Sequence, residues 1–163
     1  MNFYIANFVL ALLPPTRLFG LKRLILRMLG ISVGEETRVC GAVKFYGGGR
    51  VTIGAKCWIG LGASFYTSPG ADVEIGDRCD IAPQVAFMCG SHELGTPERR
   101  AGAGKASTIL VGAGTWIGIR SAILGGAEIG AASIVGAGSL LLPGKYPENA
   151  LLLGAPAKVT REL

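Results

Sequence analysis

The sequence contains a single histidine, and this scarcity argues against a metal centre. A zinc site needs three or four nitrogen, sulfur or carboxylate ligands from the protein. The four cysteines, Cys40, Cys57, Cys79 and Cys89, show no C-x-x-C spacing that could supply them. We therefore predict no bound metal, and we interpret the cysteines as small buried side chains of a protein kept reduced in the cytoplasm.

Aromatic residues are also few, at 7% of the chain, whereas 26 of its 163 residues are glycine. This composition favours a narrow core with tight corners over a bulky globule. The length allows one ordinary domain. Long apolar runs are absent: the apolar segment 3–13 has about half of the ~20 residues that a membrane-spanning helix needs. It also lacks a preceding basic stretch, which argues against a secretory signal.

The net charge of +5 is concentrated at the N-terminus. Residues 1–30 contain four basic and no acidic residues, so the remaining 12 basic and 11 acidic residues leave only +1 for the rest of the chain. The four basic residues are Arg17, Lys22, Arg23 and Arg27. A neutral body argues against nucleic-acid binding, and a short basic and apolar leader is typical of contact with an anionic membrane surface.

Residues 18–29 fit a helix with an apolar side and a basic side. The Pro14-Pro15 pair separates this helix from segment 3–13, and the two together resemble a helical hairpin at a membrane interface. Two interpretations stay open for residues 1–30. They either contact the inner face of the membrane peripherally, or they only cap the domain formed by residues 31–163.

A repeat of six residues organises most of that domain. Aliphatic residues recur at five successive intervals of six, and a glycine follows four of them directly. The aliphatic positions are Val111, Ile117, Ile123, Ile129, Val135 and Leu141. A period of six fits neither a helix nor a free-standing strand, so each unit must be a short strand followed by a corner. Three such units form one coil of a solenoid whose coils stack on one another.

The motifs in these repeats resemble those of the hexapeptide-repeat acetyltransferases, in the galactoside, maltose and polysaccharide O-acetyltransferase branch. The likeness covers residues 31–163 and includes Val111-Gly-Ala-Gly-Thr-Trp-Ile-Gly118, Ile134-Val-Gly-Ala-Gly-Ser139 and Gly154-Ala-Pro-Ala-Lys158. It implies an all-β fold, a left-handed parallel β-helix with a short N-terminal helical segment. It also implies a homotrimer with an active site between neighbouring subunits, and acetyl-CoA as the acyl donor.

The resemblance assigns the general base to His92. This residue ends a repeat at the point where an insertion, residues 93–108, leaves the solenoid. A neutral imidazole can take the proton of a sugar hydroxyl and make it nucleophilic toward a thioester. Glu93 and Glu98 on the insertion are candidates for orienting the imidazole or binding the sugar, although a solvated loop carboxylate is the simpler interpretation of each.

The family likeness also implies a coenzyme A site. Small residues along the groove between coils admit the pantetheine arm, and Gly118 and Ala137 occupy the matching positions. Lys158 and Arg161 correspond to basic residues that meet the nucleotide phosphates. Trp116 either flanks the cofactor or packs into a buried corner.

Other functions stay open at this point. The resemblance also fits an N-acetyltransferase acting on an amino sugar or a xenobiotic, because the base and the cofactor site would look alike. A non-catalytic β-helix that serves as a binding module would need neither His92 nor the basic tail. A trimeric carbonic anhydrase of this fold is excluded, since its metal needs three histidines.

Overall fold

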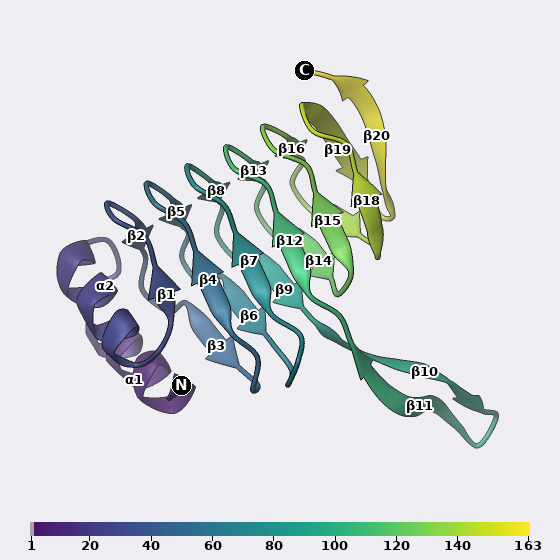
Figure 1. The fold of residues 1–163 in the computed structure, drawn as a ribbon, viewed down its shortest axis with the longest axis horizontal. Helices are drawn as coiled ribbons and strands as arrows, with labels where there is room; N and C mark the ends of the chain where they lie inside the picture. The colour runs from purple at the N-terminus through teal and green to yellow at the C-terminus, as the bar shows by residue number, and fades with distance from the viewer. Residues whose placement is uncertain (1) are drawn as a thin grey trace.

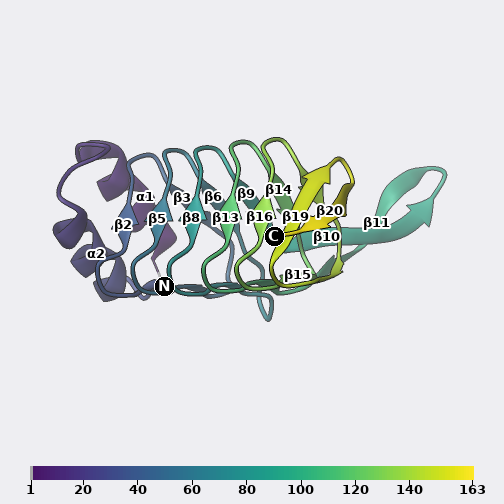
Figure 2. The same cartoon turned by 90° about the horizontal axis from the view of Figure 1, so that it is seen from above.

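Three parallel β-sheets run along the molecule and form the sides of a solenoid, which two helices cover at its N-terminal end (Figure 1). The computed structural model describes residues 2–163. The chain visits the three sheets in turn, so each coil adds one short strand to every sheet. Seen from above, the coils form a regular stack (Figure 2).

We name the sheets A, B and C. Sheet A consists of β1 (Ser32–Val33), β4 (Val51–Ile53), β7 (Val73–Ile75), β12 (Ile109–Val111), β15 (Ala127–Ile129) and β18 (Gly144–Tyr146). Sheet B consists of β2 (Arg38–Val39), β5 (Trp58–Ile59), β8 (Asp80–Ile81), β13 (Trp116–Ile117), β16 (Ile134–Val135), β19 (Ala150–Gly154) and β20 (Ala157–Glu162). Sheet C consists of β3 (Lys44–Tyr46), β6 (Ser64–Tyr66), β9 (Ala86–Met88), β14 (Ala122–Leu124) and β17 (Leu140–Leu141).

Four positions in each six-residue unit have distinct structural roles. In the unit that begins at Ile117, the isoleucine is buried in the core. A Cβ on the next residue, Gly118, would lie 2.5 Å from the backbone nitrogen of Ala137 on the following coil, so only glycine lets the coils approach. Arg120 turns the corner with a left-handed backbone (φ 60°), and Ser121 is buried inside that corner. The predicted repeat is confirmed, but this glycine serves coil contact and not the bend.

The core is a single column of stacked side chains inside the three sheets. Its widest part is a ladder of buried phenylalanines, in which Phe65 lies between Phe45 and Phe87 at ring distances of 5.1 and 5.0 Å. Because the units repeat, a residue packs mainly on its counterparts one coil away. The all-β solenoid with a short helical segment is thus confirmed, while its left-handed sense stays a prediction of the family resemblance.

The helices α1 (Phe3–Leu12) and α2 (Phe19–Met28) close the N-terminal end of the stack. The side-chain amide of Asn7 donates to the Phe45 carbonyl (2.9 Å) and accepts from the Phe45 amide (2.8 Å), so it satisfies the free edge of β3 as another strand would. On α2, Lys22 is buried, and its ammonium group donates to the carbonyls of Pro14 and Pro15 at 2.7 and 2.9 Å. The two helices therefore cover the N-terminal end of the solenoid, and contact of residues 1–30 with a membrane stays a prediction.

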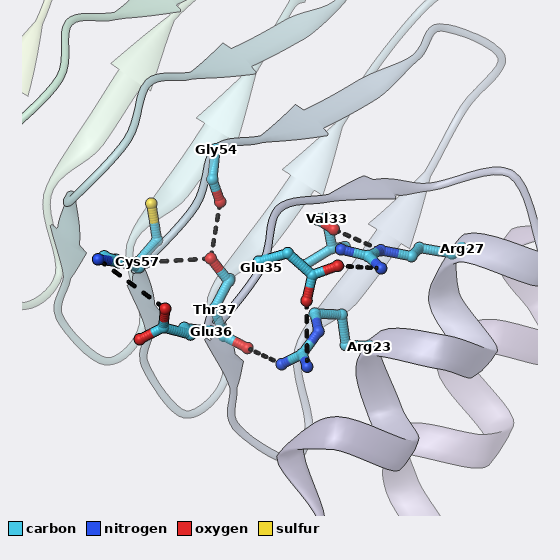
Figure 3. Close-up of polar contacts among 9 residues, drawn as sticks. Arg23, Arg27, Val33, Glu35, Glu36, Thr37, Gly54 and Cys57 are labelled. Carbon is cyan, nitrogen blue, oxygen red and sulfur yellow. Dashed lines mark hydrogen bonds and ion pairs between the residues drawn. The ribbon is translucent and has the colours of Figure 1, made fainter.

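Polar contacts fasten α2 to the first coils (Figure 3). Arg27 donates to the Val33 carbonyl and pairs with Glu35 at 2.9 Å, and Arg23 lies 3.6 Å from the same carboxylate. Inside the coils, the Thr37 hydroxyl donates to the Gly54 carbonyl (2.6 Å) and accepts from the Cys57 amide (3.0 Å). The contacts of Arg23 and Arg27 orient α2 so that its basic side faces the solenoid.

One element leaves the stack. Between β9 and β12, strands β10 (Gly90–Thr96) and β11 (Arg99–Ala106) pair antiparallel and form a hairpin that projects from the solenoid, away from the helical end (Figures 1 and 2). The insertion predicted as a loop at residues 93–108 is therefore a two-stranded arm. Nearly all of its residues are exposed.

Candidate active site

His92 lies on β10, at the base of the hairpin and just beyond the end of β9. The sequence places His92 at the end of a repeat, and in the structure the chain leaves the coil three residues earlier, after Cys89, so that His92 lies on the hairpin. The side chain is exposed, and its Nδ1 atom lies 3.0 Å from the carbonyl oxygen of Gly102 on β11. The hairpin therefore holds the imidazole ring in one orientation.

This contact decides which ring nitrogen carries the proton. A carbonyl oxygen can only accept a hydrogen bond, so Nδ1 must be the donor. In the neutral imidazole the lone pair then belongs to Nε2, and that atom is available to accept a proton. The same arrangement, a ring nitrogen tied to a fixed acceptor while the other nitrogen acts as a base, serves general-base catalysis by histidine in other enzymes.

A pocket of about 370 Å³ opens beside this ring. The hairpin supplies one wall, and the turns after β14 and β17 supply the other. Its lining includes Ser91, Lys105 and Ser107 from the arm and Leu124 and Pro143 from the solenoid. None of these five residues was predicted from the sequence. Ser91, Lys105 and Ser107 lie near the ends of the insertion, and this position was the only signal that could have indicated them. Leu124 and Pro143 are far from it in the sequence and come to the pocket only through the fold.

The two acidic candidates on the hairpin differ in position. Glu93 follows His92 and pairs with Lys105 across the hairpin at 3.1 Å, with both side chains more than half exposed. Glu98 lies at the far turn, where a hydrogen bond with the Thr96 side chain lowers the pKa of its carboxyl. Neither carboxylate is hydrogen-bonded to the imidazole. Both carboxylates are exposed in the single chain, and their role toward a sugar stays a prediction.

The residues expected to hold coenzyme A lie on sheet B and its next corner. Gly118 and Ala137 are neighbours on successive coils, and Ala137 is exposed. Trp116 points outward from β13 with 54% of its surface exposed, so the alternative of buried corner packing is wrong. Lys158 and Arg161 lie on β20, which pairs antiparallel with β19 at the last coil.

These two groups of residues do not meet within one chain. His92 follows the end of a sheet C strand, whereas Gly118 and Ala137 precede the beginnings of sheet C strands. Because the strands are parallel, their beginnings share one edge of the sheet and their ends share the other. A three-residue strand such as β14, ~10 Å long, therefore separates the imidazole from the predicted coenzyme A groove.

Several other features of the chain bear on its chemistry. All four cysteines are buried free thiols, which confirms their interpretation as small core side chains. Across residues 2–163 the structure has no group of three or more histidine, cysteine or acidic side chains arranged to hold a metal. In the same part of the chain, neither helix has the length and apolarity needed to cross a bilayer.

Comparison with known proteins connects this geometry to a family. The family model described as bacterial transferase hexapeptide (six repeats) matches residues 108–143. The predicted resemblance to the hexapeptide-repeat family is therefore confirmed. This segment spans β12 to β17, the coils in which the six-residue spacing is most regular.

Two relatives and one solved structure extend the likeness to most of the chain. The galactoside O-acetyltransferase of Escherichia coli K12 is 32% identical over 81% of this chain, which spans 64% of that protein's length. WcaF of the same organism, provisionally named a colanic acid biosynthesis acetyltransferase, is 28% identical over 91% of this chain and 78% of its own. A hexapeptide-repeat acetyltransferase from Vibrio cholerae, solved with acetyl coenzyme A, has a TM-score of 0.81 and 26% identity over 98% of this chain and 84% of its own.

Proposed function

We propose that the protein is an acetyl-CoA-dependent O-acetyltransferase that acts on a sugar hydroxyl, with His92 as its general base. One observation carries this proposal: the hydrogen bond from Nδ1 of His92 to the Gly102 carbonyl, which in the neutral ring places the lone pair on Nε2, beside a pocket. The names of the Escherichia coli galactoside O-acetyltransferase and of the Vibrio cholerae acetyltransferase support the same chemistry.

The reaction follows from the free lone pair. Nε2 accepts the proton of the sugar hydroxyl while the hydroxyl oxygen attacks the carbonyl carbon of the thioester. A backbone N–H of a neighbouring coil stabilises the negative charge on the tetrahedral oxygen. When the intermediate collapses, the carbon–sulfur bond breaks, and the proton returns from the imidazole to the departing thiolate. The products are the acetyl ester and free coenzyme A.

The complete site is formed by more than one copy of the chain. The separation of His92 from Gly118 and Ala137 supports this, because a second copy can bring its groove to the first copy's imidazole. The outer face of sheet C also supports it, since a column of apolar side chains, including Tyr66, Met88 and Leu124, faces outward there. We propose a homotrimer, in which Trp116, Lys158 and Arg161 hold the coenzyme of a neighbouring site.

The acceptor is a glycan of the cell surface or its lipid-linked precursor. The basic and apolar residues 1–30 support work at the cytoplasmic face of a membrane, and the four free thiols support a reducing compartment. Glu93 and Glu98 are candidates for contacts with the sugar, because the hairpin that carries them forms one wall of the pocket.

The test is an acetyl-transfer assay that measures thiol release from acetyl-CoA with a panel of glycans and amino sugars. We expect ester formation on a glycan, and His92→Ala should lower the rate by about 10²–10⁴-fold because it removes the base. Arg100→Ala, on the same exposed hairpin, is the matched control and should retain wild-type turnover. Unchanged size in light scattering would show that both variants assemble normally.

Three results would contradict the proposal. Near wild-type turnover of His92→Ala would remove the imidazole from the mechanism. Amide formation on amino sugars without any ester product would make the protein an N-acetyltransferase. Binding of a glycan without thiol release would make it a binding module.

A further inference from the structure

The outward side of the helical cap is apolar along its whole length. The two helices and the turn between them expose eight large apolar side chains, each with at least 44% of its surface accessible. These are Tyr4, Ile5, Phe8, Leu12, Leu18, Leu21, Leu24 and Met28. Their opposite sides pack on the first coil through Phe3, Ala6 and Leu10 of α1 and Leu26 of α2. The exposed residues therefore face away from the solenoid.

The helix α2 turns its apolar side to solvent and its basic side to the solenoid, the reverse of the usual orientation of a surface helix. A helix on the surface of a globular protein normally buries its apolar side and exposes its charged side. Here Lys22 is fully buried and Arg23 and Arg27 face the coils, whereas Leu21, Leu24 and Met28 face outward. Figure 3 shows both arginines directed toward the first coils and Glu35. Exposed apolar side chains in this number on two adjoining helices mark a contact with another apolar phase or molecule.

The net positive charge of the helical cap indicates that the apolar phase is an anionic membrane. No acidic residue occurs in residues 1–34, and four basic ones do. Arg23 and Arg27 share one carboxylate, that of Glu35, and Arg17 has no ion pair within residues 2–163. The helical cap as a whole therefore carries a net positive charge behind its apolar surface, and Arg17 is exposed in the turn between the helices. A positively charged cap with an apolar outer surface complements an anionic lipid bilayer. A second copy of the same surface would instead bring like charges together.

We propose that α1 and α2 form an interfacial layer that lies on an anionic membrane and holds the solenoid upright above it. Asn7 supports this geometry, because its two hydrogen bonds to Phe45 hold α1 across the free edge of β3 at the end of the stack. The hairpin that carries His92 projects away from this layer (Figure 1). The pocket therefore opens at a set height over the lipid.

The height of the pocket above the membrane restricts which acceptors can reach it. This inference rests on the proposed function. The β9 strand that leads to His92 is two strand spacings from β3, or ~10 Å. The helical layer beneath adds a further ~10 Å, of which roughly half sinks into the interface. A single sugar on a lipid phosphate stays within the headgroup layer and does not reach the pocket. The acceptor class is a lipid-linked oligosaccharide, acetylated on a residue several units from the lipid.

The first experiment measures flotation of the full-length protein with vesicles. We expect binding to phosphatidylcholine vesicles that contain phosphatidylglycerol, and weak binding to phosphatidylcholine alone. The double substitution Phe8→Ser with Leu24→Ser should weaken the binding at least about tenfold, since it removes two large apolar side chains from the interface. Leu110→Ser is the matched control, because Leu110 is exposed on sheet A, and it should bind as the wild type does.

Two results of this experiment would overturn the membrane contact. One is wild-type binding by the double variant. The other is a wild-type protein that stays unbound but loses an oligomer when the two residues are changed, which would assign the surface to a second copy. Circular dichroism melting of all variants separates these outcomes from misfolding.

The second experiment compares one oligosaccharide in two forms, free in solution and lipid-linked in anionic vesicles. The double variant should acetylate the free form at the wild-type rate and the lipid-linked form about tenfold more slowly. Equal rates on both forms would overturn the inference and leave the proposed function intact. Absence of ester formation on either form by the wild type would instead overturn the proposed function.

Discussion

The solenoid and the β10–β11 hairpin belong to one chain but keep their shapes in different ways. In the solenoid, each inward side chain packs on its counterparts above and below, as Phe65 does between Phe45 and Phe87. In the hairpin nearly every side chain is exposed, and Leu94 has 85% of its surface accessible. The hairpin is held by backbone pairing, by the Glu93–Lys105 ion pair and by the His92 contact.

This difference indicates that the packed coils supply most of the stability, whereas the candidate site lies on the exposed hairpin. An isolated two-stranded hairpin is marginally stable in water, so an exposed arm of this length calls for a partner surface. The coils supply a packed core, whereas the sole histidine lies on the exposed hairpin. The assembly of several copies proposed above would supply that surface and complete a site on the arm.

The largest contrast should appear in stability. Phe65→Ala should lower the free energy of unfolding by about 3–5 kcal/mol, because it leaves a cavity in the phenylalanine ladder. Leu94→Ser should change it by no more than about 0.5 kcal/mol, since the side chain is exposed in the single chain. Urea denaturation of the two variants measures both values. A loss for Leu94→Ser that grows with protein concentration would sharpen the comparison, because it would show the hairpin packed on another copy.

A smaller effect should separate two glycines that lie on the same strand of the hairpin. A Cβ at Gly102 would lie 2.9 Å from the Glu93 carbonyl oxygen, so Gly102→Ala must displace the carbonyl that orients His92. We expect a loss in kcat of about tenfold or more, with KM for acetyl-CoA unchanged. Gly104→Ala meets no atom within 4 Å and should keep wild-type kinetics. Equal kinetics for both variants would mean that the Gly102 contact does not position the base.

The smallest effect concerns acid stability of the solenoid. Asp72 accepts hydrogen bonds from the Arg50 amide and from its guanidinium group, and these hold the pKa of the Asp72 carboxyl below its ordinary value. A depressed pKa stabilises the folded state above the ordinary aspartate pKa of about 3.9, and this contribution is lost as the pH falls through the folded-state pKa. Wild type should therefore exceed Asp72→Asn in melting temperature near neutral pH, and the gap should shrink below about pH 4. A difference in melting temperature that stays constant with pH would show that ionisation of the Asp72 carboxyl does not cause it.

Much of the architecture follows from local sequence. The intervals of six between Val111 and Leu141 require a short strand and a corner in every unit, and the small residues after them fill the corners. The position of His92 at the start of an insertion also follows, because the repeat ends there. The orientation of α2 does not follow from its amphipathic pattern, since the ion pairs with Glu35 and the burial of Lys22 turn its apolar side outward.

By itself, the sequence determined the stack of coils, because a repeat requires only contacts between neighbouring units, and it located the single histidine at the start of the insertion. Only the tertiary structure decided that Nδ1 of His92 meets the Gly102 carbonyl, that the helical cap presents an apolar surface, and that the imidazole and the predicted coenzyme groove lie at opposite edges of sheet C. These features depend on how segments far apart in the chain are oriented in space, and no local pattern encodes that.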